Sequence, residues 1–184
     1  WSAQSVQLFS DVYHRSGARV DFSSSAVLST AVSKLDAAGY RATFGLEVEF
    51  QIYQQLDPAL GHAQATMPPA AISTQNLTQG HQYLTETRYG EAEDLLDHLR
   101  RMAEQLGLNP RSMEIEMGPS QFEFTFAPAD PMTHADNMVM FRTAVQQVCA
   151  AQGLHATFMC RPVLPNTAAS GWHLHQSLQH TGTG

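Results

Sequence analysis

The most informative segment of the chain reads Glu114-Ile-Glu-Met-Gly-Pro-Ser-Gln-Phe-Glu-Phe-Thr-Phe126. From position 121 onward polar and aromatic residues alternate, so a strand here would bury the phenylalanines and place Glu123 on the opposite face. Gly118-Pro119 lies between Glu116 and Glu123 and predicts a bend or bulge. Such a bend can bring these two acids onto one surface.

Two further segments show the same alternation. In Gly45-Leu-Glu-Val-Glu-Phe50, Glu47 and Glu49 share one face, and the apolar residues take the other. In Gly171-Trp-His-Leu-His-Gln-Ser-Leu178, one face carries three polar residues, His173, His175 and Ser177. Three predicted strands therefore each offer acids or imidazoles at alternate positions.

An alternating strand is usually half-solvated, so each strand alone says little about function. The three together say more, because four carboxylates and two imidazoles on one surface would repel one another unless a cation lay among them. Carboxylate oxygens favour Mg²⁺ or Mn²⁺, and an imidazole among them favours Mn²⁺ tolerance. Zinc is disfavoured because the acids outnumber the imidazoles. Such a site suits phosphoryl transfer, in which cations bridge phosphate oxygens.

The composition narrows the class of protein. The chain has 184 residues, 43% of them hydrophobic, with 17 acids and 10 bases and a net charge of −7. These values indicate one globular domain, and the absence of a basic patch in the sequence disfavours nucleic-acid binding. No apolar run approaches about 20 residues, so no membrane span is expected. Two cysteines without a CxxC motif fit a reducing, cytoplasmic location.

The order of elements predicts an α+β fold, with helices on one face of a sheet and the polar strand faces on the other. Expected strands are residues 5–13, 20–22, 41–53, two within 112–127, 155–163 and one around 173; expected helices are 23–38, 90–106 and 131–151, with a long loop at 55–88. The expected buried stripe of the first helix is Val27, Leu28, Ala31 and Leu35. Acids expected in the first turn of the second helix are Glu91, Glu93 and Asp94.

Four motifs, in this order and spacing, resemble those of the glutamine synthetase family. They are Glu47-Val-Glu-Phe50, Glu116-Met-Gly-Pro-Ser-Gln-Phe-Glu123, His155-Ala-Thr-Phe-Met-Cys-Arg-Pro162 and Ser170-Gly-Trp-His-Leu-His-Gln-Ser177. The resemblance implies part of such a catalytic domain, with an antiparallel-rich curved sheet. Residues 1–22 would end a small N-terminal β-grasp-like region and its linker, and residues 23–184 would form the first half of the catalytic domain.

The resemblance also implies an ATP-dependent ligation, in which the γ-carboxylate of glutamate is phosphorylated and an amine attacks the acyl phosphate. By motif position, Glu49, Glu116 and Glu123 would hold one Mg²⁺ or Mn²⁺ ion. Glu47 and His173 would hold a second ion beside the ATP phosphates. The family forms ring-shaped homo-oligomers with sites shared between subunits.

The same resemblance implies that two further residues of the last motif contact the nucleotide. His175 would contact phosphate, and Ser177 would contact the nucleotide region. The alternative for His175 is a solvated side chain that pairs with a strand neighbour. The sequence has neither a Walker loop nor a GxGxxG motif, so a nucleotide would be held by the metals and the sheet.

The chain departs from the family at the amino-acid pocket. Ala168 and Ala169 stand where ammonia-using members have an Asn-Gly pair that helps to bind glutamate, while Ser120 and Arg161 replace a usual Gly and Lys. These departures indicate a divergent branch that includes γ-glutamylpolyamine synthetases, so an amine other than ammonia is expected. The resemblance places the arginines that stabilise the phosphoryl group, and the flap acid, in the downstream half of such a protein. We therefore expect the chain alone not to catalyse ligation.

Two other functions are compatible with the residues. A non-catalytic homologue, serving as a structural or sensing module, is favoured by the altered pocket and opposed by the retained metal-ligand types. A metal-dependent hydrolase on the same sheet would need a water-activating base and would not use ATP, so nucleotide-dependent metal affinity separates it from a ligase.

Overall fold

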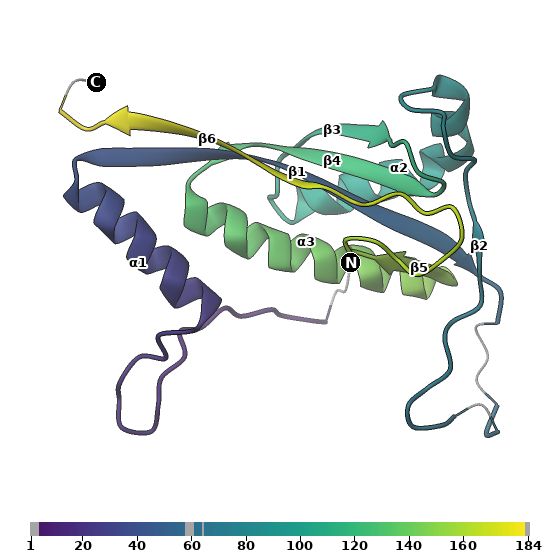
Figure 1. Ribbon diagram of the computed structural model, residues 1–184, viewed down its shortest axis with the longest axis horizontal. Helices are drawn as coiled ribbons and strands as arrows, with labels where there is room; N and C mark the ends of the chain where they lie inside the picture. Colours follow the sequence, from purple (N-terminus) through teal and green to yellow (C-terminus); the bar gives the residue numbers. More distant parts are fainter. Residues whose placement is uncertain (1–3, 58–60, 64, 183–184) are drawn as a thin grey trace.

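The computed structural model describes residues 4–57, 61–63 and 65–182. Pro58 of the expected loop, and the outermost residues of both predicted domains (1–3 and 183–184), lie outside the described residues. The described chain forms a six-stranded sheet built around β1 (Tyr40–Gln55), which is long enough to pair with four other strands (Figure 1). None of its helices combines the length and hydropathy needed to cross a membrane.

Every pairing recorded in this sheet is antiparallel. On one side of β1 lies β4 (Gln121–Ala129), which in turn pairs with β3 (Pro110–Ile115). The short strand β2 (Thr74–Asn76) pairs with the C-terminal end of β1 on this same side. On the other side lie β6 (Trp172–His180) and β5 (Leu154–Thr157). The strand around His173 thus reaches β1 from the side opposite to β4.

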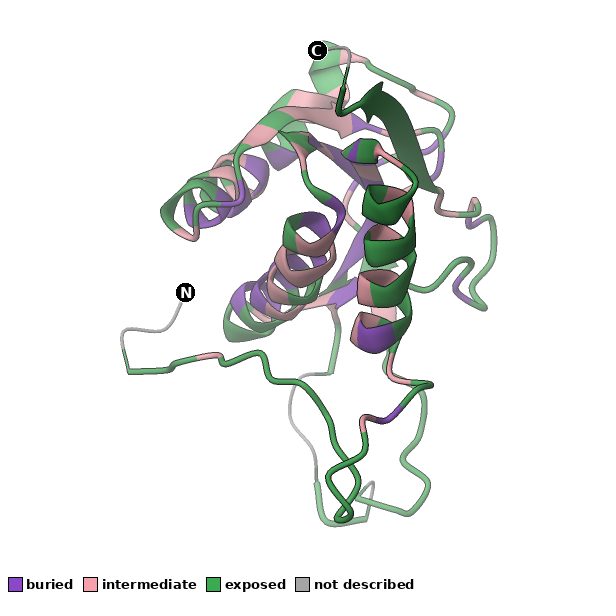
Figure 2. Cartoon of the chain, turned by 90° about the vertical axis from the view of Figure 1, so that its left-hand side faces the viewer, coloured by how far each residue is buried: buried purple, intermediate pink, exposed green. Residues whose placement is uncertain are grey.

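Three helices cover one face of the sheet: α1 (Ser24–Ala37), α2 (Glu86–Gln105) and α3 (Pro131–Ala151). Buried positions gather between these helices and the sheet (Figure 2). The centre of this core is aromatic, because the alternation of β1 and β4 turns Phe50 and Phe124 toward Phe141 of α3. The predicted α+β architecture, with helices on one face, is confirmed.

The predicted start of α3 is also confirmed. The Asp130 side chain accepts the Thr133 backbone N–H at 3.0 Å, and Pro131 occupies the first helical turn. The sequence also predicts Ala135, Met138, Val139, Val145 and Val148 as the core side of this helix, and Val139 is wrong because it is 48% exposed. Its side chain lines an apolar hollow between α1 and α3, and the described residues do not close that hollow.

The expected strand at residues 5–13 is wrong, and so is its return strand at 20–22. The chain there forms an isolated bridge between Tyr13 and Arg19, with a hydrogen bond from the Val20 N–H to the Val12 carbonyl. Apart from Val20, which is buried, the large apolar side chains of the two expected strands are exposed. A strand needs a neighbour to accept its hydrogen bonds, and the described sheet lies elsewhere. The strand expected at 155–163 ends at Thr157, because Phe158 turns inward to stack on Phe50.

The expected faces of the first two helices also need correction. In α1 the buried residue is Ala26, while Val27 is 56% exposed, because the helix covers only the end of β1. Ala31 is also exposed, and Leu28 and Leu35 are half-buried. Helix α2 begins at Glu86 rather than near Gly90, since Thr85 already takes the extended backbone of an N-cap. Acids that therefore lie beyond its first turn are Glu91, Glu93 and Asp94.

Candidate functional site

The face of the sheet opposite the helices carries the polar residues of β1, β4 and β6. Glu49 of β1 lies directly opposite Glu123 of β4, and Glu47 lies directly opposite His173 of β6. Alternate residues of a strand share a face, and directly opposed residues of paired strands lie side by side. The structure therefore brings these four side chains onto one surface.

Glu116 reaches the same surface through the tight turn at residues 117–120. The turn is closed by a hydrogen bond from the Glu116 N–H to the Gln121 carbonyl at 3.0 Å. It separates β3 from β4 at the Gly-Pro break that the sequence indicates. As a result, Glu49, Glu116 and Glu123 offer carboxylate oxygens that all lie within 4.8 Å of one another.

A second group of potential ligands shares Glu123 with the first. Glu47, Glu123 and His173 offer ligand atoms within 4.8 Å of one another. His173 Nδ1 lies 3.1 Å from Glu47 Oε2 and 3.9 Å from Glu123 Oε1. Five of the residues predicted as metal ligands thus form two adjoining groups, and Glu123 lies at the junction.

The electrostatics of the two groups favour a cation. Burial raises the pKa of Glu123 to about 8, and repulsion from Glu116, Glu47 and the other nearby acids adds to the shift. Burial also raises the pKa of Glu116, against a hydrogen bond from the Met117 N–H. Among the described residues, the ion pairs at these acids are made by histidines. The donor set of carboxylates and one imidazole therefore fits a divalent cation such as Mg²⁺ or Mn²⁺.

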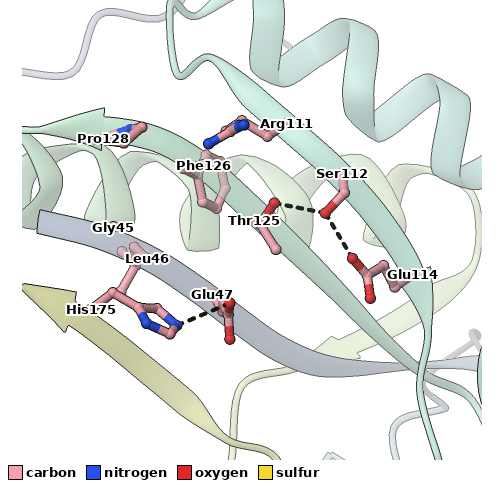
Figure 3. A pocket seen from close by; sticks show the side chains of 10 residues that line it. All are labelled: Gly45, Leu46, Glu47, Arg111, Ser112, Glu114, Thr125, Phe126, Pro128 and His175. Atoms are coloured by element: carbon pink, nitrogen blue, oxygen red, sulfur yellow. Dashed lines mark hydrogen bonds and ion pairs between the residues drawn. The ribbon is translucent and has the colours of Figure 1, made fainter.

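His175 lies beside this cluster, at the edge of a hollow of about 540 Å³ (Figure 3). Its Nε2 lies 3.0 Å from Glu47 Oε1, so the imidazole pairs with a strand neighbour while 66% of its side chain stays exposed. Residues from β1, β3 and β4 complete the lining, with Arg111 and Glu114 among them. Ser177 lies two residues farther along β6, opposite Thr43, and does not line the hollow.

Ala168 and Ala169 lie in the loop that precedes β6. Their backbone carbonyls are held from the sheet: Gln51 Nε2 donates to the Ala168 oxygen at 3.1 Å, and Gln121 Nε2 donates to the Ala169 oxygen at 2.9 Å. Ala168 also packs against the 117–120 turn, since a Cβ at Gly118 would lie 2.8 Å from its Cβ. The loop is thus held against the acidic cluster, and its two side chains are methyl groups that cannot hydrogen-bond.

Sequence reasoning missed four residues of this region. Gln121 donates to Glu49, and its place on the same strand face as Glu123 could have indicated this. Gly171 packs against the cluster, because a Cβ there would lie 2.7 Å from Glu49 Oε1. Two further residues were missed because only the fold brings them near the acids: Glu114, opposite Glu123 on β3, and Tyr83, whose pKa is raised by burial and by four glutamates.

The fold and the site define an α+β segment with a carboxylate-rich sheet face. Residues 23–184 match the catalytic domain of glutamine synthetase. The chain therefore belongs to the glutamine synthetase family.

Its curated relatives are considerably longer. Gamma-glutamylanilide synthase of an Acinetobacter species is 33% identical over 182 residues, which are 97% of this chain and 36% of the relative. Glutamate–isopropylamine ligase of a Pseudomonas species is 24% identical over 97% of this chain and 37% of that protein. Glutamine synthetase of Halobacterium salinarum is 29% identical over 95% of this chain and 36% of its own length. The chain spans about a third of the length of these relatives.

Solved structures confirm the fold class. A ligand-free GmaS structure superposes with a TM-score of 0.76 and 24% identity, over 94% of this chain and 38% of that chain. The electron cryomicroscopy structure of Plasmodium falciparum glutamine synthetase gives a TM-score of 0.73 and 18% identity, over 92% and 36% of the two chains.

Proposed function

We propose that the protein to which this chain belongs is an ATP-dependent carbon–nitrogen ligase of the glutamine synthetase type. A glutamate-like acid would be activated as the γ-glutamyl phosphate, and an amine would attack the acyl carbon with loss of phosphate. One observation carries the proposal: two ligand groups that share Glu123 lie on one sheet face of a chain from this family.

In this proposal, Glu49, Glu116 and Glu123 hold one Mg²⁺ or Mn²⁺ ion, and Glu47 and His173 hold the second. Such ions, when bound, neutralise the charge that develops on the oxygens of a transferring phosphoryl group. The chain contributes preorganisation: strand pairing fixes Glu49 opposite Glu123, and the 3.1 Å contact with His173 orients Glu47.

ATP is the proposed phosphoryl donor, and we propose that it binds in the hollow beside the cluster. His175 and Glu47 line this hollow together, so a phosphate near the second ion would lie within reach of the His175 imidazole. The pairing of His175 with Glu47 is compatible with this role, because an imidazole N–H that donates to a carboxylate oxygen can donate to a phosphate oxygen instead. Ser177, exposed farther along β6, is proposed to contact the rest of the nucleotide.

The proposed amine is a primary amine that carries a carbon substituent, rather than ammonia. The methyl groups of Ala168 and Ala169 support this, because by the family resemblance they stand where ammonia-using members have an Asn-Gly pair, in a loop that is held against the cluster. The names of the two amine-using relatives, an anilide synthase and an isopropylamine ligase, point to aryl and branched alkyl amines. A polyamine, as the sequence first indicates, is a further candidate to be tested beside them.

Because the chain spans about a third of its relatives' length, we propose that it does not catalyse ligation alone. The whole protein is proposed to be a cytoplasmic, ring-shaped homo-oligomer.

Two measurements test the function. The first is a calorimetric titration of this chain with Mn²⁺, with and without a non-hydrolysable ATP analogue; saturable binding that the analogue strengthens is expected. The second is ADP release by the full-length protein with glutamate and, in turn, isopropylamine, aniline, putrescine and ammonium. Release that needs both glutamate and an organic amine is expected. Metal binding without any ADP release would instead favour the non-catalytic module, and ATP-independent hydrolysis would favour the hydrolase.

A further inference from the structure

Gln121 joins three parts of the site that are far apart in the chain. Its side chain is 1% exposed. Its Nε2 lies 2.9 Å from Glu49 Oε2, 2.9 Å from the Ala169 carbonyl oxygen and 3.2 Å from Ser170 Oγ. Its Oε1 accepts the Gly118 N–H at 2.9 Å. One amide therefore contacts the acidic cluster, the loop before β6 and the turn that carries Glu116.

The chemistry of these partners fixes the orientation of the amide. A backbone N–H can only donate, so the atom beside Gly118 must be the oxygen. A carboxylate and a carbonyl can only accept, so the atom beside Glu49 and Ala169 must be the nitrogen. Glutamate at this position would turn a second anion toward Glu49, and an apolar residue would leave buried groups unpaired. Only an amide of this length satisfies all of these partners.

A neutral donor suits the carboxylate of a metal site better than a charged one. Lys or Arg beside Glu49 would neutralise the carboxylate and compete with the cation. The Gln121 amide orients the carboxylate through one oxygen and leaves its charge available. Outer partners of this kind hold metal ligands in position, and their loss typically costs about 10- to 100-fold in metal affinity.

We propose that Gln121 is a positioning residue that couples Glu49, within the acidic cluster, to the order of the Ala168–Ser170 loop. This inference rests on the metal centre of the proposed function and adds a connection to it. A cation that fixes the position of Glu49 would also fix the Gln121 amide that donates to it. Through its bond to the Ala169 carbonyl, this amide would then order the loop on which the acid and amine substrates are proposed to bind. By linkage, an ordered loop would strengthen cation binding by the same factor.

Gln51 provides a matched control. It lies directly opposite Gln121 in the β1–β4 pairing and is also fully buried. It donates to the neighbouring carbonyl of the same loop, that of Ala168, but its recorded hydrogen bond reaches no carboxylate of the cluster. Gln51→Met therefore removes one hydrogen bond to the loop, and Gln121→Met removes the bonds to Ala169 and Ser170. Only the Gln121 substitution also removes the contacts to Glu49 and to the Gly118 N–H.

The test compares Mn²⁺ affinity and hydrogen exchange in the unmodified chain and both variants, each checked for its fold by circular dichroism. In the unmodified chain, Mn²⁺ is expected to slow exchange at residues 168–171. Both variants should speed exchange there without metal. Gln121→Met should weaken Mn²⁺ binding by about 10-fold or more, whereas Gln51→Met should leave it nearly unchanged.

The outcomes separate this inference from the proposed function. If the unmodified chain binds Mn²⁺ but Gln121→Met binds it equally well, the positioning role is wrong and the metal centre stands. Equal weakening by both variants would also overturn it, because general loop order would then explain the effect. If either variant fails to fold, the exchange of the unmodified chain decides: no slowing at 168–171 on saturation with Mn²⁺ refutes the coupling. No Mn²⁺ binding to the unmodified chain overturns the metal centre and this inference together.

Discussion

Glu49 and Glu123 lie directly opposite each other on the paired strands β1 and β4. Like charges in this position destabilise a sheet, and here Glu116 adds a third carboxylate within 4.8 Å. This repulsion can be relieved by a proton on Glu123, whose pKa is raised to about 8. It can also be relieved by a bound divalent cation. The proton and the cation compete for the same carboxylate oxygens.

Removal of the shared carboxylate should disable both ligand groups. We expect Glu123→Gln to weaken Mn²⁺ binding by at least about 100-fold, since a buried ligand common to both groups is lost. Calorimetric titration at pH 7.5 measures the change. Glu114→Gln is the matched control, because Glu114 lies opposite Glu123 on β3 and belongs to neither group. Equal losses in the two variants would mean that net charge alone attracts the ion.

The same substitution should stabilise the metal-free fold at high pH. The folded pKa of Glu123 is raised from 4.5 to about 8 by burial and nearby acids, so the folded state binds the extra proton. The stability that this proton confers is present below pH 4.5 and is lost as the pH rises toward 8. Metal-free Glu123→Gln should therefore have the higher melting temperature at pH 8 and nearly the same one at pH 5. A lower melting temperature at pH 8 would contradict the raised pKa.

Mn²⁺ affinity should rise with pH. Below its raised pKa Glu123 carries a proton that the cation must displace, so affinity should increase by about tenfold per pH unit where one proton is released. The increase should level off near pH 8, the pKa of this carboxyl. Titrations in buffers of different ionisation enthalpy would count the released protons. A flat profile between pH 6 and pH 8 would show that Glu123 is already ionised.

A methyl group at position 171 should distort the cluster. A Cβ on Gly171 would lie 2.7 Å from both Glu49 Oε1 and His173 Nε2, so Gly171→Ala should displace one of them and weaken Mn²⁺ binding by at least about tenfold. Gly90→Ala is the control: nothing lies within 4 Å of its Cβ, and removing a mid-helix glycine should stabilise α2 by about 0.5–1 kcal/mol. Unchanged Mn²⁺ binding by Gly171→Ala would mean that Glu49 and His173 lie farther from Gly171 than these distances indicate.

Much of the site could be read from local patterns. Alternation in three short segments placed the acids and histidines on strand faces, and the Gly118-Pro119 break predicted the turn that brings Glu116 beside Glu123. The strand predicted at residues 5–13 is not formed, because no partner strand is described for it. Periodicity reports which residues share a face; it does not report whether a second element covers that face, as the exposed Val27 of α1 illustrates.

The amino-acid sequence alone was sufficient for the α+β class, the family resemblance and the residue types of the proposed metal centre, because these depend on spacing within short segments. Tertiary structure alone decided that Glu123 belongs to both ligand groups, that Glu114 and Tyr83 lie near them, and that Gln121 reaches Glu49 and Ala169. These relationships depend on strand register across β1 and β4 and on the path of the loop before β6. Register and loop path are set by packing between segments far apart in the chain, and no local pattern contains that information.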